Sequence, residues 1–279
     1  MLEVRSCRGF EELDACIRLQ LATWGYDEMD VVPRRMFIVA QRVGGQVLGA
    51  FTADNTLIGF AMALPGIHAG APYLHSHMLA VEPQFRNTGV GRRLKLAQRE
   101  DALKRGIRRM EWTFDPLEIK NTFFNIEKLG AITRSYTPNF YGVSSARIQG
   151  GRPTDRLHAE WWLENERVTE AVAGRRAPRG EIEMRIELPH QVMQWKESAE
   201  GAEQAMALQR TNQAQFAEAF ARGLAVTGFS RDQQGNGWFE LSQWALPDQP
   251  RALSDEPQAQ SDQPQALPER LPASSTASE

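Results

Sequence analysis

The segment of the chain best suited to chemistry spans residues 77–94. A predicted strand ends at Glu82-Pro83, and Gly89-x-Gly91 then opens a predicted helix. Glycines in such a turn let the backbone adopt positive φ and approach a ligand closely. The free N–H groups of the first helical turn and the helix dipole both favour a bound anion. The segment therefore predicts a cradle for a phosphate or pyrophosphate group.

Two common nucleotide-binding motifs do not fit this segment. There is no G-x-x-x-x-G-K-[ST] sequence, which excludes a P-loop. Leu94 stands where the third glycine of a dinucleotide fingerprint belongs. The expected ligand is therefore a phosphate compound of another class.

The longer phrase Val81-Glu-Pro-Gln-Phe85-Arg86-x-x-Gly89-x-Gly91-x-x-Leu94 closely resembles the coenzyme A pyrophosphate motif of the GNAT acyltransferase superfamily, [Gln/Arg]-x-x-Gly-x-[Gly/Ala]. Residues 57–60 resemble the strand before the cofactor strand, and Lys128-Leu-Gly130 ends a helix as the family's last helix ends. This resemblance covers about residues 1–148. Farther along, several segments resemble a bacterial family of predicted GNAT acetyltransferases: 114–116, Asn121, 139–142, 154–156 and 160–163.

The resemblance implies a co-substrate, acetyl-CoA, in a gap where strand 73–81 separates from strand 107–114. An amine or hydroxyl of a small-molecule acceptor then attacks the thioester directly, and a backbone amide near Leu79 stabilises the oxyanion. The cofactor-binding residues so implied are Leu79, Val81, Arg86, Asn87, Thr88, Gly89, Val90, Gly91, Arg92, Arg93, Asn121 and Asn125. Asn121 has a second interpretation, as a residue of the helix N-terminus.

Two pairs of residues are candidates for the general base. His75 and His77 alternate on the cofactor strand, and a histidine near its reference pKa suits proton abstraction. Either is equally well a hydrogen-bonded core residue. Asp115 and Glu118 follow the next strand at the mouth of the expected gap, where helix capping is the alternative role, for Asp115 especially.

The general acid departs from the family pattern. Many GNAT enzymes have a tyrosine two residues before the lysine of the Lys-Leu-Gly ending, and here that residue is Ile126. An isoleucine cannot protonate a thiolate. Tyr136 or Tyr141 is the predicted substitute, with solvent or the loss of catalysis as alternatives.

The elements that position these residues alternate between strands and helices. Up to residue 148 the predicted order is β-α-α-β-β-β-α-β-α-β, with strands at 156–163, 181–188, 224–229 and 237–243 and a helix at 198–222 beyond it. Trp161 and Trp162 are expected to pack on opposite faces of their strand. Residues 164–180 are polar and punctuated by Gly and Pro, which predicts a linker or long surface loop.

The predicted fold class is α/β (mixed α+β). We expect a GNAT-like twisted mixed sheet flanked by helices over residues 1–148, which form the acetyl-CoA-binding domain. A C-terminal α/β extension covers 149–245. Residues 246–279 are rich in Pro, Gln and Ser and predict a disordered tail. The sequence leaves open whether the extension is a separate domain or completes the first sheet.

Composition narrows the class of protein. The chain has 279 residues, 42% of them hydrophobic and 24% charged, and a net charge of −3, which is typical of a soluble globular protein and not of a general polyanion binder. No apolar run suggests a membrane helix or secretory signal, and Cys7 and Cys16 predict reduced thiols in a cytoplasmic protein. No metal site and no nucleic-acid or membrane partner is expected. Self-association is left open.

The sequence therefore predicts a transferase, an N-acetyltransferase acting on a small amine or related acceptor. The alternative is a non-catalytic protein on the same fold that binds or senses CoA, or serves as an interaction module.

Overall fold

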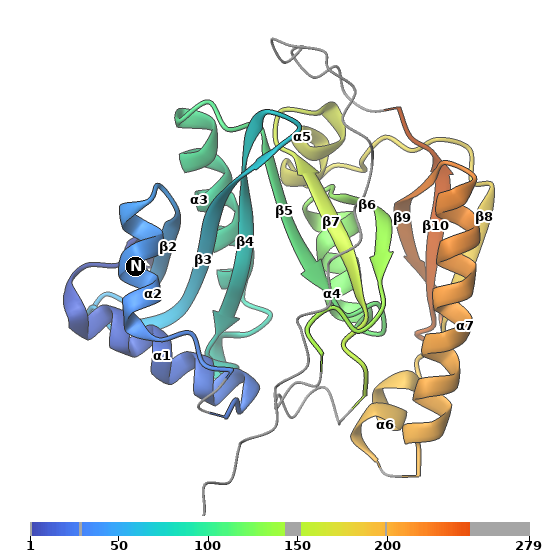
Figure 1. Ribbon diagram of the computed structural model, residues 1–279, viewed down its shortest axis with the longest axis horizontal. Helices are drawn as coiled ribbons and strands as arrows, with labels where there is room; N and C mark the ends of the chain where they lie inside the picture. The colour runs from blue at the N-terminus through green and yellow to red at the C-terminus, as the bar shows by residue number, and fades with distance from the viewer. Residues whose placement is uncertain (1, 28–29, 143–151, 199, 246–279) are drawn as a thin grey trace, which may run out of the picture. The chain divides into compact units, whose positions relative to one another are not determined.

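The computed structural model describes residues 2–27, 30–142, 152–198 and 200–245. Its strands form one sheet in the order β1-β2-β3-β4-β5-β7-β6-β9-β10-β8 (Figure 1). They are β1 (Glu3–Ser6), β2 (Gln46–Phe51), β3 (Leu57–His68), β4 (Ala71–Val81), β5 (Arg109–Phe114), β6 (Ile132–Thr137), β7 (Arg156–Trp162), β8 (Met184–Leu188), β9 (Leu224–Arg231) and β10 (Gly237–Gln243). Neighbouring strands are antiparallel except for the parallel pair β4–β5. The mixed sheet with helices confirms the predicted fold class, and the tail predicted at 246–279 lies outside the described residues.

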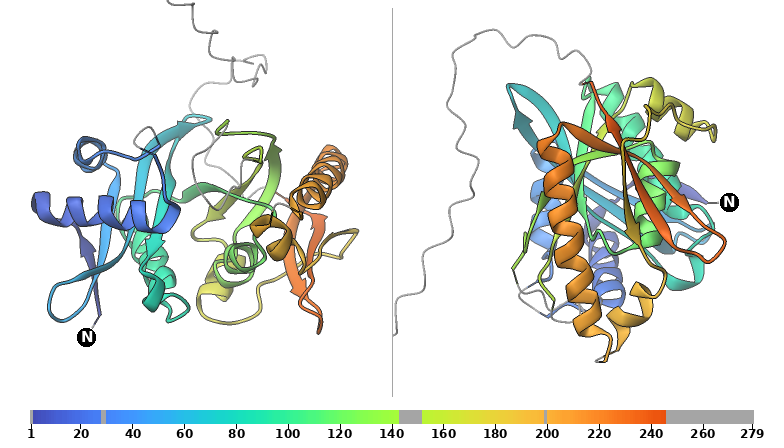
Figure 2. Two further views of the ribbon diagram at one scale, coloured as in Figure 1. Left: turned by 90° about the horizontal axis from the view of Figure 1, so that it is seen from below. Right: turned by 90° about the vertical axis from the view of Figure 1, so that its right-hand side faces the viewer.

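The helices cover the sheet from both sides. They are α1 (Gly9–Trp24), α2 (Arg34–Arg42), α3 (Val90–Lys104), α4 (Ile119–Phe123), α5 (Glu166–Val172), α6 (Val192–Glu197) and α7 (Ala202–Ala221), with a 3-10 turn at Pro83–Phe85. The pair α1 and α2 packs on one face of the first strands, and α3 packs on the other (Figure 2). Among the described residues, none of these helices has the length and apolar character needed to cross a bilayer.

Strands on both sides of position 148 share the sheet. β7 is inserted between β5 and β6 and pairs antiparallel with both. β6 in turn meets β9 at Thr133–Val226, and β10 and β8 follow. As expected, Trp161 and Trp162 of β7 are packing residues in two different apolar clusters.

The element order predicted up to residue 137 is confirmed, but the loop predicted at 164–180 is wrong, because α5 lies within it. The Asn165 side chain accepts a hydrogen bond from the Arg167 N–H (2.9 Å) and so caps the helix. The buried Arg167 guanidinium donates to the carbonyls of Gly130, Pro178 and Ile126. These tertiary contacts stabilise a short helix that the polar composition of residues 164–180 does not predict.

Strands β4 and β5 are paired at only one end. Their parallel register is confined to Leu74–Met110 and His75–Glu111, and the strands separate beyond it. On the other side of β4, Met78 faces Met62 and Ser76 faces Ala63, so His77 is the extra residue of a β-bulge. A bulge reverses the alternation of side chains, which is why both Ser76 and Leu79 are directed at α3.

Candidate functional site

A cavity of about 370 Å³ occupies the gap between β4 and β5. It is bordered by β4, α3, β5, α4 and the α1–α2 connection. Its lining residues are Trp24, Tyr26, Asp30, Val32, Ser76, His77, Met78, Leu79, Lys95, Trp112, Thr113, Phe114, Asp115, Glu118, Asn121, Phe124, Asn125, Tyr141 and Arg156. Of the residues predicted for the site, it brings together His77, Leu79, Asp115, Glu118, Asn121, Asn125 and Tyr141.

The glycine turn precedes α3 at the open end of β4. Asn87 has φ 62° and Gly89 φ 91°, both left-handed, and no side chain caps the helix that starts at Val90. In helical geometry the first N–H groups of α3 have no acceptor within the helix. A Cβ on Gly89 would meet no described atom within 4 Å. The turn therefore has the open backbone expected of an anion cradle.

The polar side chains around the turn also hold it in place. Thr88 Oγ1 donates to the Phe85 carbonyl (2.7 Å). Three arginines each donate to a backbone carbonyl: Arg86 to Val81 (3.0 Å), Arg92 to Val172, and Arg93 to Leu2 (2.7 Å). Because a guanidinium carries five N–H donors, these contacts do not exhaust its capacity to bind phosphate.

The two candidate histidines occupy different surroundings. His77, at the bulge, is exposed to the cavity, and desolvation by the surrounding protein lowers its pKa. His75 does not line the cavity, and its ring centroid lies 6.2 Å from that of His77. Burial, assisted by the charges of His77, Lys95 and His158, lowers the pKa of His75 to about 4. Of the pair, only His77 is placed to exchange a proton with a molecule in the cavity.

Asp115 and Glu118 line the cavity but are bound to a lysine of the extension. Lys196 Nζ on α6 donates to Asp115 Oδ2 (2.9 Å) and to Glu118, and only 4% of its side chain is exposed. Asp115 Oδ1 accepts from the Leu117 N–H (2.8 Å), which is a turn contact ahead of α4 and not the helix cap considered as its alternative role. Burial alone would raise the pKa of Asp115, but Lys196 and the Leu117 amide outweigh it and lower the pKa. This carboxylate is thus a weak proton acceptor.

The two candidate tyrosines are separated by the sheet. Tyr141 lines the cavity, and its hydroxyl is 2.9 Å from Thr113 Oγ1. Tyr136 is absent from the lining and donates to Asp155 Oδ2 at 2.5 Å. Burial and that carboxylate raise the pKa of Tyr136. Ile126, at the position of the family's usual tyrosine, is fully buried. The geometry therefore favours Tyr141 over Tyr136 as a proton donor.

Asn121 and Asn125 line the cavity one helical turn apart. Asn125 Nδ2 lies 3.5 Å from Asn121 Oδ1, and the chain changes from α4 to a π-helical turn at Phe124–Lys128. Single π-turns occur frequently at functional sites. Both amides are placed to bond a ligand that threads the gap.

Sequence reasoning missed several lining residues, of which Lys95 is the most unusual. Its Nζ donates to Ser76 Oγ (2.7 Å) and lies 3.7 Å from the centroid of the Trp112 ring. Burial lowers the pKa of Lys95 to about 7. In the sequence it is one of nine basic residues between positions 86 and 109, and no motif marks it. The available signal is its place on the helix, because the buried residues Gln98 and Ala102, three and seven positions farther on, share its face of α3.

The end of α1 and the α1–α2 connection form another wall of this cavity, which the sequence did not predict. The Tyr26 ring stacks on Trp24 with centroids 5.5 Å apart, and both line the cavity. Burial, followed by the charge of Asp30, raises the pKa of Tyr26. No motif marks these residues, since they reach the cavity only through the fold.

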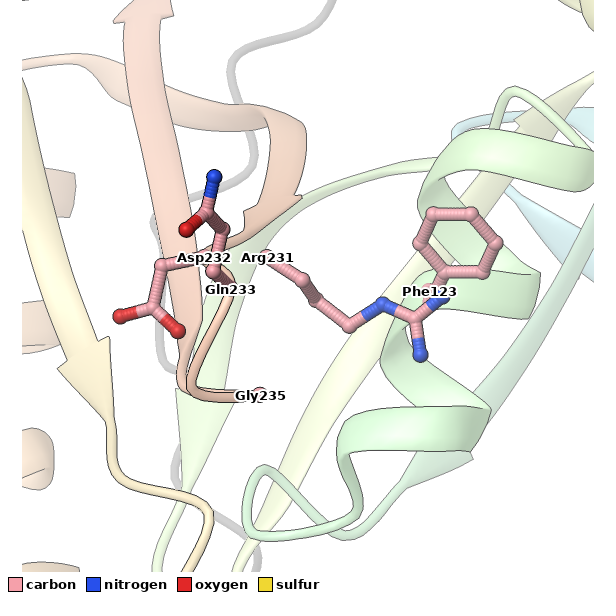
Figure 3. Close-up of a pocket in the computed structure, with 5 residues that line it drawn as sticks. All are labelled: Phe123, Arg231, Asp232, Gln233 and Gly235. Carbon is pink, nitrogen blue, oxygen red and sulfur yellow. The ribbon is translucent and has the colours of Figure 1, made fainter.

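A second cavity, of about 410 Å³, lies at the β9–β10 turn and is lined by Phe123, Arg231, Asp232, Gln233 and Gly235 (Figure 3). The Arg231 guanidinium points at the Phe123 ring, 4.4 Å from its centroid. Both Asp232 carboxylate oxygens accept hydrogen bonds from Asn236 within the turn. Its polar groups thus serve the turn itself, and the cavity between β4 and β5 is the better site for chemistry.

Comparisons with known proteins agree with the geometry. Residues 13–130 match the model of the Acetyltransferase (GNAT) family. The part of the chain that carries the glycine turn, the separated strands and α3 is therefore similar to the acetyltransferase domain of the GNAT family. A comparison with curated proteins gives no match.

Several solved structures are similar to part of the chain. The aminoglycoside 6'-acetyltransferase type Ii is 19% identical with a TM-score of 0.47, covering 58% of this chain and 98% of that one. Ard1 from Thermoplasma volcanium is 13% identical with a TM-score of 0.43, covering 57% and 95%. A chain of the NatC complex bound to Gag peptide and CoA is 14% identical with a TM-score of 0.46, covering 57% and 96%.

Proposed function

We propose that the protein is an acetyl-CoA-dependent acyltransferase that moves an acetyl group to a small amine or related acceptor by direct attack. One observation carries the proposal: β4 and β5 separate around a cavity, and Leu79, which lines that cavity, also lies beside Gly91 of the glycine turn. The match to the GNAT family over residues 13–130 supports acyl transfer in general. The acceptor class is part of the proposal.

Different residues of the chain are assigned to the pyrophosphate, the pantetheine arm and the oxyanion. The N–H groups at the start of α3, with Arg86, hold the pyrophosphate of CoA. Leu79 and Val81 of β4, with Asn121 and Asn125 across the gap, hold the pantetheine arm. The thioester then lies beside the β-bulge, where backbone N–H groups near Leu79 stabilise the oxyanion.

Proton transfer completes the reaction. His77, largely neutral at pH 7 because its pKa is lowered, accepts the proton of the attacking amine. The new C–N bond forms as the C–S bond breaks, and the departing thiolate takes the Tyr141 hydroxyl proton or one from solvent. Acetylated acceptor and free CoA are the products.

Calorimetry with acetyl-CoA tests the cradle, using Gly89→Asp. The substitution adds a negative charge where the pyrophosphate is proposed to lie, so saturable binding should be lost. In thermal shift, a ligand at 100 times its Kd stabilises the folded wild type by about 2.7 kcal/mol. Gly106→Asp is the matched control, since Gly106 also has positive φ and no atom within 4 Å of an ideal Cβ. Equal binding by Gly89→Asp and the wild type would refute the cradle.

The non-catalytic alternative has one specific observation in its favour. Ile126 is fully buried at the position where many GNAT enzymes have a tyrosine. Release of free CoA from acetyl-CoA in the presence of an amine panel separates the two functions. Acceptor-dependent release supports an enzyme, whereas tight CoA binding without release supports a sensor or an interaction protein.

A further inference from the structure

Lys95 places a buried ammonium against neutral groups. It lies on α3, fully buried, with Nζ donating to Ser76 Oγ (2.7 Å) and resting over the Trp112 ring (3.7 Å). Ser76 Oγ donates its own proton to Gln98 Oε1 (3.0 Å), so it meets Lys95 with a lone pair. A lone-pair acceptor and an aromatic face both favour the cationic form of the lysine.

The charge of Lys95 is not balanced by the surrounding protein. Among residues 2–27, 30–142, 152–198 and 200–245, no carboxylate forms an ion pair with it, and desolvation is the sole cause that lowers its pKa. The nearby His75 is itself kept neutral, its pKa lowered to about 4 first by burial. An uncompensated buried charge is costly, and an anion entering the cavity would offset that cost.

Lys95 also stands at the closed end of the gap. The last β4–β5 pair is His75–Glu111, and the two residues that Lys95 contacts, Ser76 and Trp112, are the first beyond it. All three border the cavity. Whatever enters between the strands therefore ends against this ammonium, one of whose three N–H donors is used by Ser76.

From this juxtaposition we propose that Lys95 is a binding site for a carboxylate, so that the transferase selects a substrate carrying one. The carboxylate arrives either at the far end of the acyl group of the thioester or on the acceptor. The transfer reaction is the one proposed above. The acceptor's nitrogen replaces the sulfur on the acyl carbon, and the carboxylate takes no part in the bond changes. This inference rests on the proposed function.

Calorimetry on the full chain tests the proposal in two arms. The donor arm compares CoA, acetyl-CoA and succinyl-CoA; the acceptor arm compares amino acids with their amides at saturating CoA. In one of the two arms the compound with the carboxylate, succinyl-CoA or the amino acid, should bind about tenfold more tightly than acetyl-CoA or the amide. A charge-assisted hydrogen bond is of this strength. That ratio should fall to about one in Lys95→Met, which keeps an unbranched apolar side chain and removes the ammonium. The arm that responds identifies the source of the carboxylate.

Lys104→Met is the matched control, because Lys104 lies on the same helix with 71% of its side chain exposed. It should keep the wild-type ratio. No carboxylate preference in either arm, or a preference that persists in Lys95→Met, would overturn the proposal while leaving acetyl-CoA binding intact. If CoA itself did not bind, the proposed function would be refuted, and the carboxylate site that rests on it would be refuted as well.

A role as general base is a separate outcome. In that case Lys95→Met would abolish turnover of acetyl-CoA with a neutral amine and remove the limb of the pH–rate profile near pH 7, with carboxylate binding unchanged. This result would also overturn the proposal.

Discussion

The two sides of the cavity differ in whether backbone groups of one segment or side chains of distant segments form them. On the α3 side, the glycine turn presents backbone N–H groups from one contiguous, exposed segment. On the β5 side, side chains from distant segments meet: Lys196 binds Asp115, 81 positions away in the chain. Backbone features depend on local sequence, whereas the ion pair depends on the whole fold. The first kind of site is thus visible in a motif, and the second appears only when the sheet is assembled.

The two sides should also differ in whether substitutions there affect ligand binding or folding stability. A phosphate cradle must stay open to solvent to receive its ligand, and residues 86–89 of the turn are exposed. Lys196, on the β5 side, is 4% exposed and forms ion pairs with two carboxylates. Breaking a buried pair leaves an uncompensated charge, which is strongly destabilising. Substitutions on this side should therefore act mainly on the free energy of unfolding.

Lys196→Met should have the largest effect on stability. It leaves Asp115 and Glu118 together with no cation between them, and we expect the free energy of unfolding to fall by about 3–5 kcal/mol. Urea denaturation measures the change. Lys104→Met removes the exposed pair with Glu100 and should change the free energy of unfolding far less, because surface ion pairs contribute little. Equal losses in the two variants would mean that the Lys196 cluster is no more than a surface ion pair.

The pH dependence of stability should change in the same variant. The pKa of Asp115 is lowered in the folded wild type, so its contribution is present above the usual value of 3.8 and is lost as pH falls through the lower folded pKa. Without Lys196, burial remains to raise that pKa. Protonation of Asp115 should then relieve the buried charge in Lys196→Met, so the difference in unfolding free energy between variant and wild type should shrink as pH falls, as urea denaturation at a series of acidic pH values measures.

His77→Gln should have the next largest effect, on catalysis rather than folding. Loss of a general base lowers kcat by about 100-fold or more. Because desolvation lowers the pKa of His77, the wild-type rate should fall only as pH drops below the ordinary histidine value of 6.5. The acidic limb should vanish in the variant. His75→Gln is the control, since His75 lies outside the cavity lining and should leave that limb in place.

Much of the fold and part of the site were predictable from the sequence. The periodic patterns located the strands and helices up to residue 137, and the phrase around Gly89 located the turn before α3. Lys95 was counted as one basic residue among many, because its solvation depends on which face of α3 meets the sheet. Lys196 carries no local signal, and Asp155 carries only that of the family-like segment 154–156. Their partners are fixed by the insertion of β7 and by α6, which sequence reasoning did not predict.

The smallest expected effect separates the two tyrosines. Tyr136→Phe keeps the ring stacked on Phe216, 5.6 Å between centroids, and removes one hydrogen bond from Asp155, which retains that from the Asn139 N–H. The cost in unfolding free energy should be about 1–2 kcal/mol, with kcat unchanged. Tyr141→Phe should reverse this pattern, because its exposed hydroxyl contributes little to stability but faces the cavity. If Tyr136→Phe lowered kcat and Tyr141→Phe did not, the proton donor would have to reach the thiolate from the buried side of the sheet.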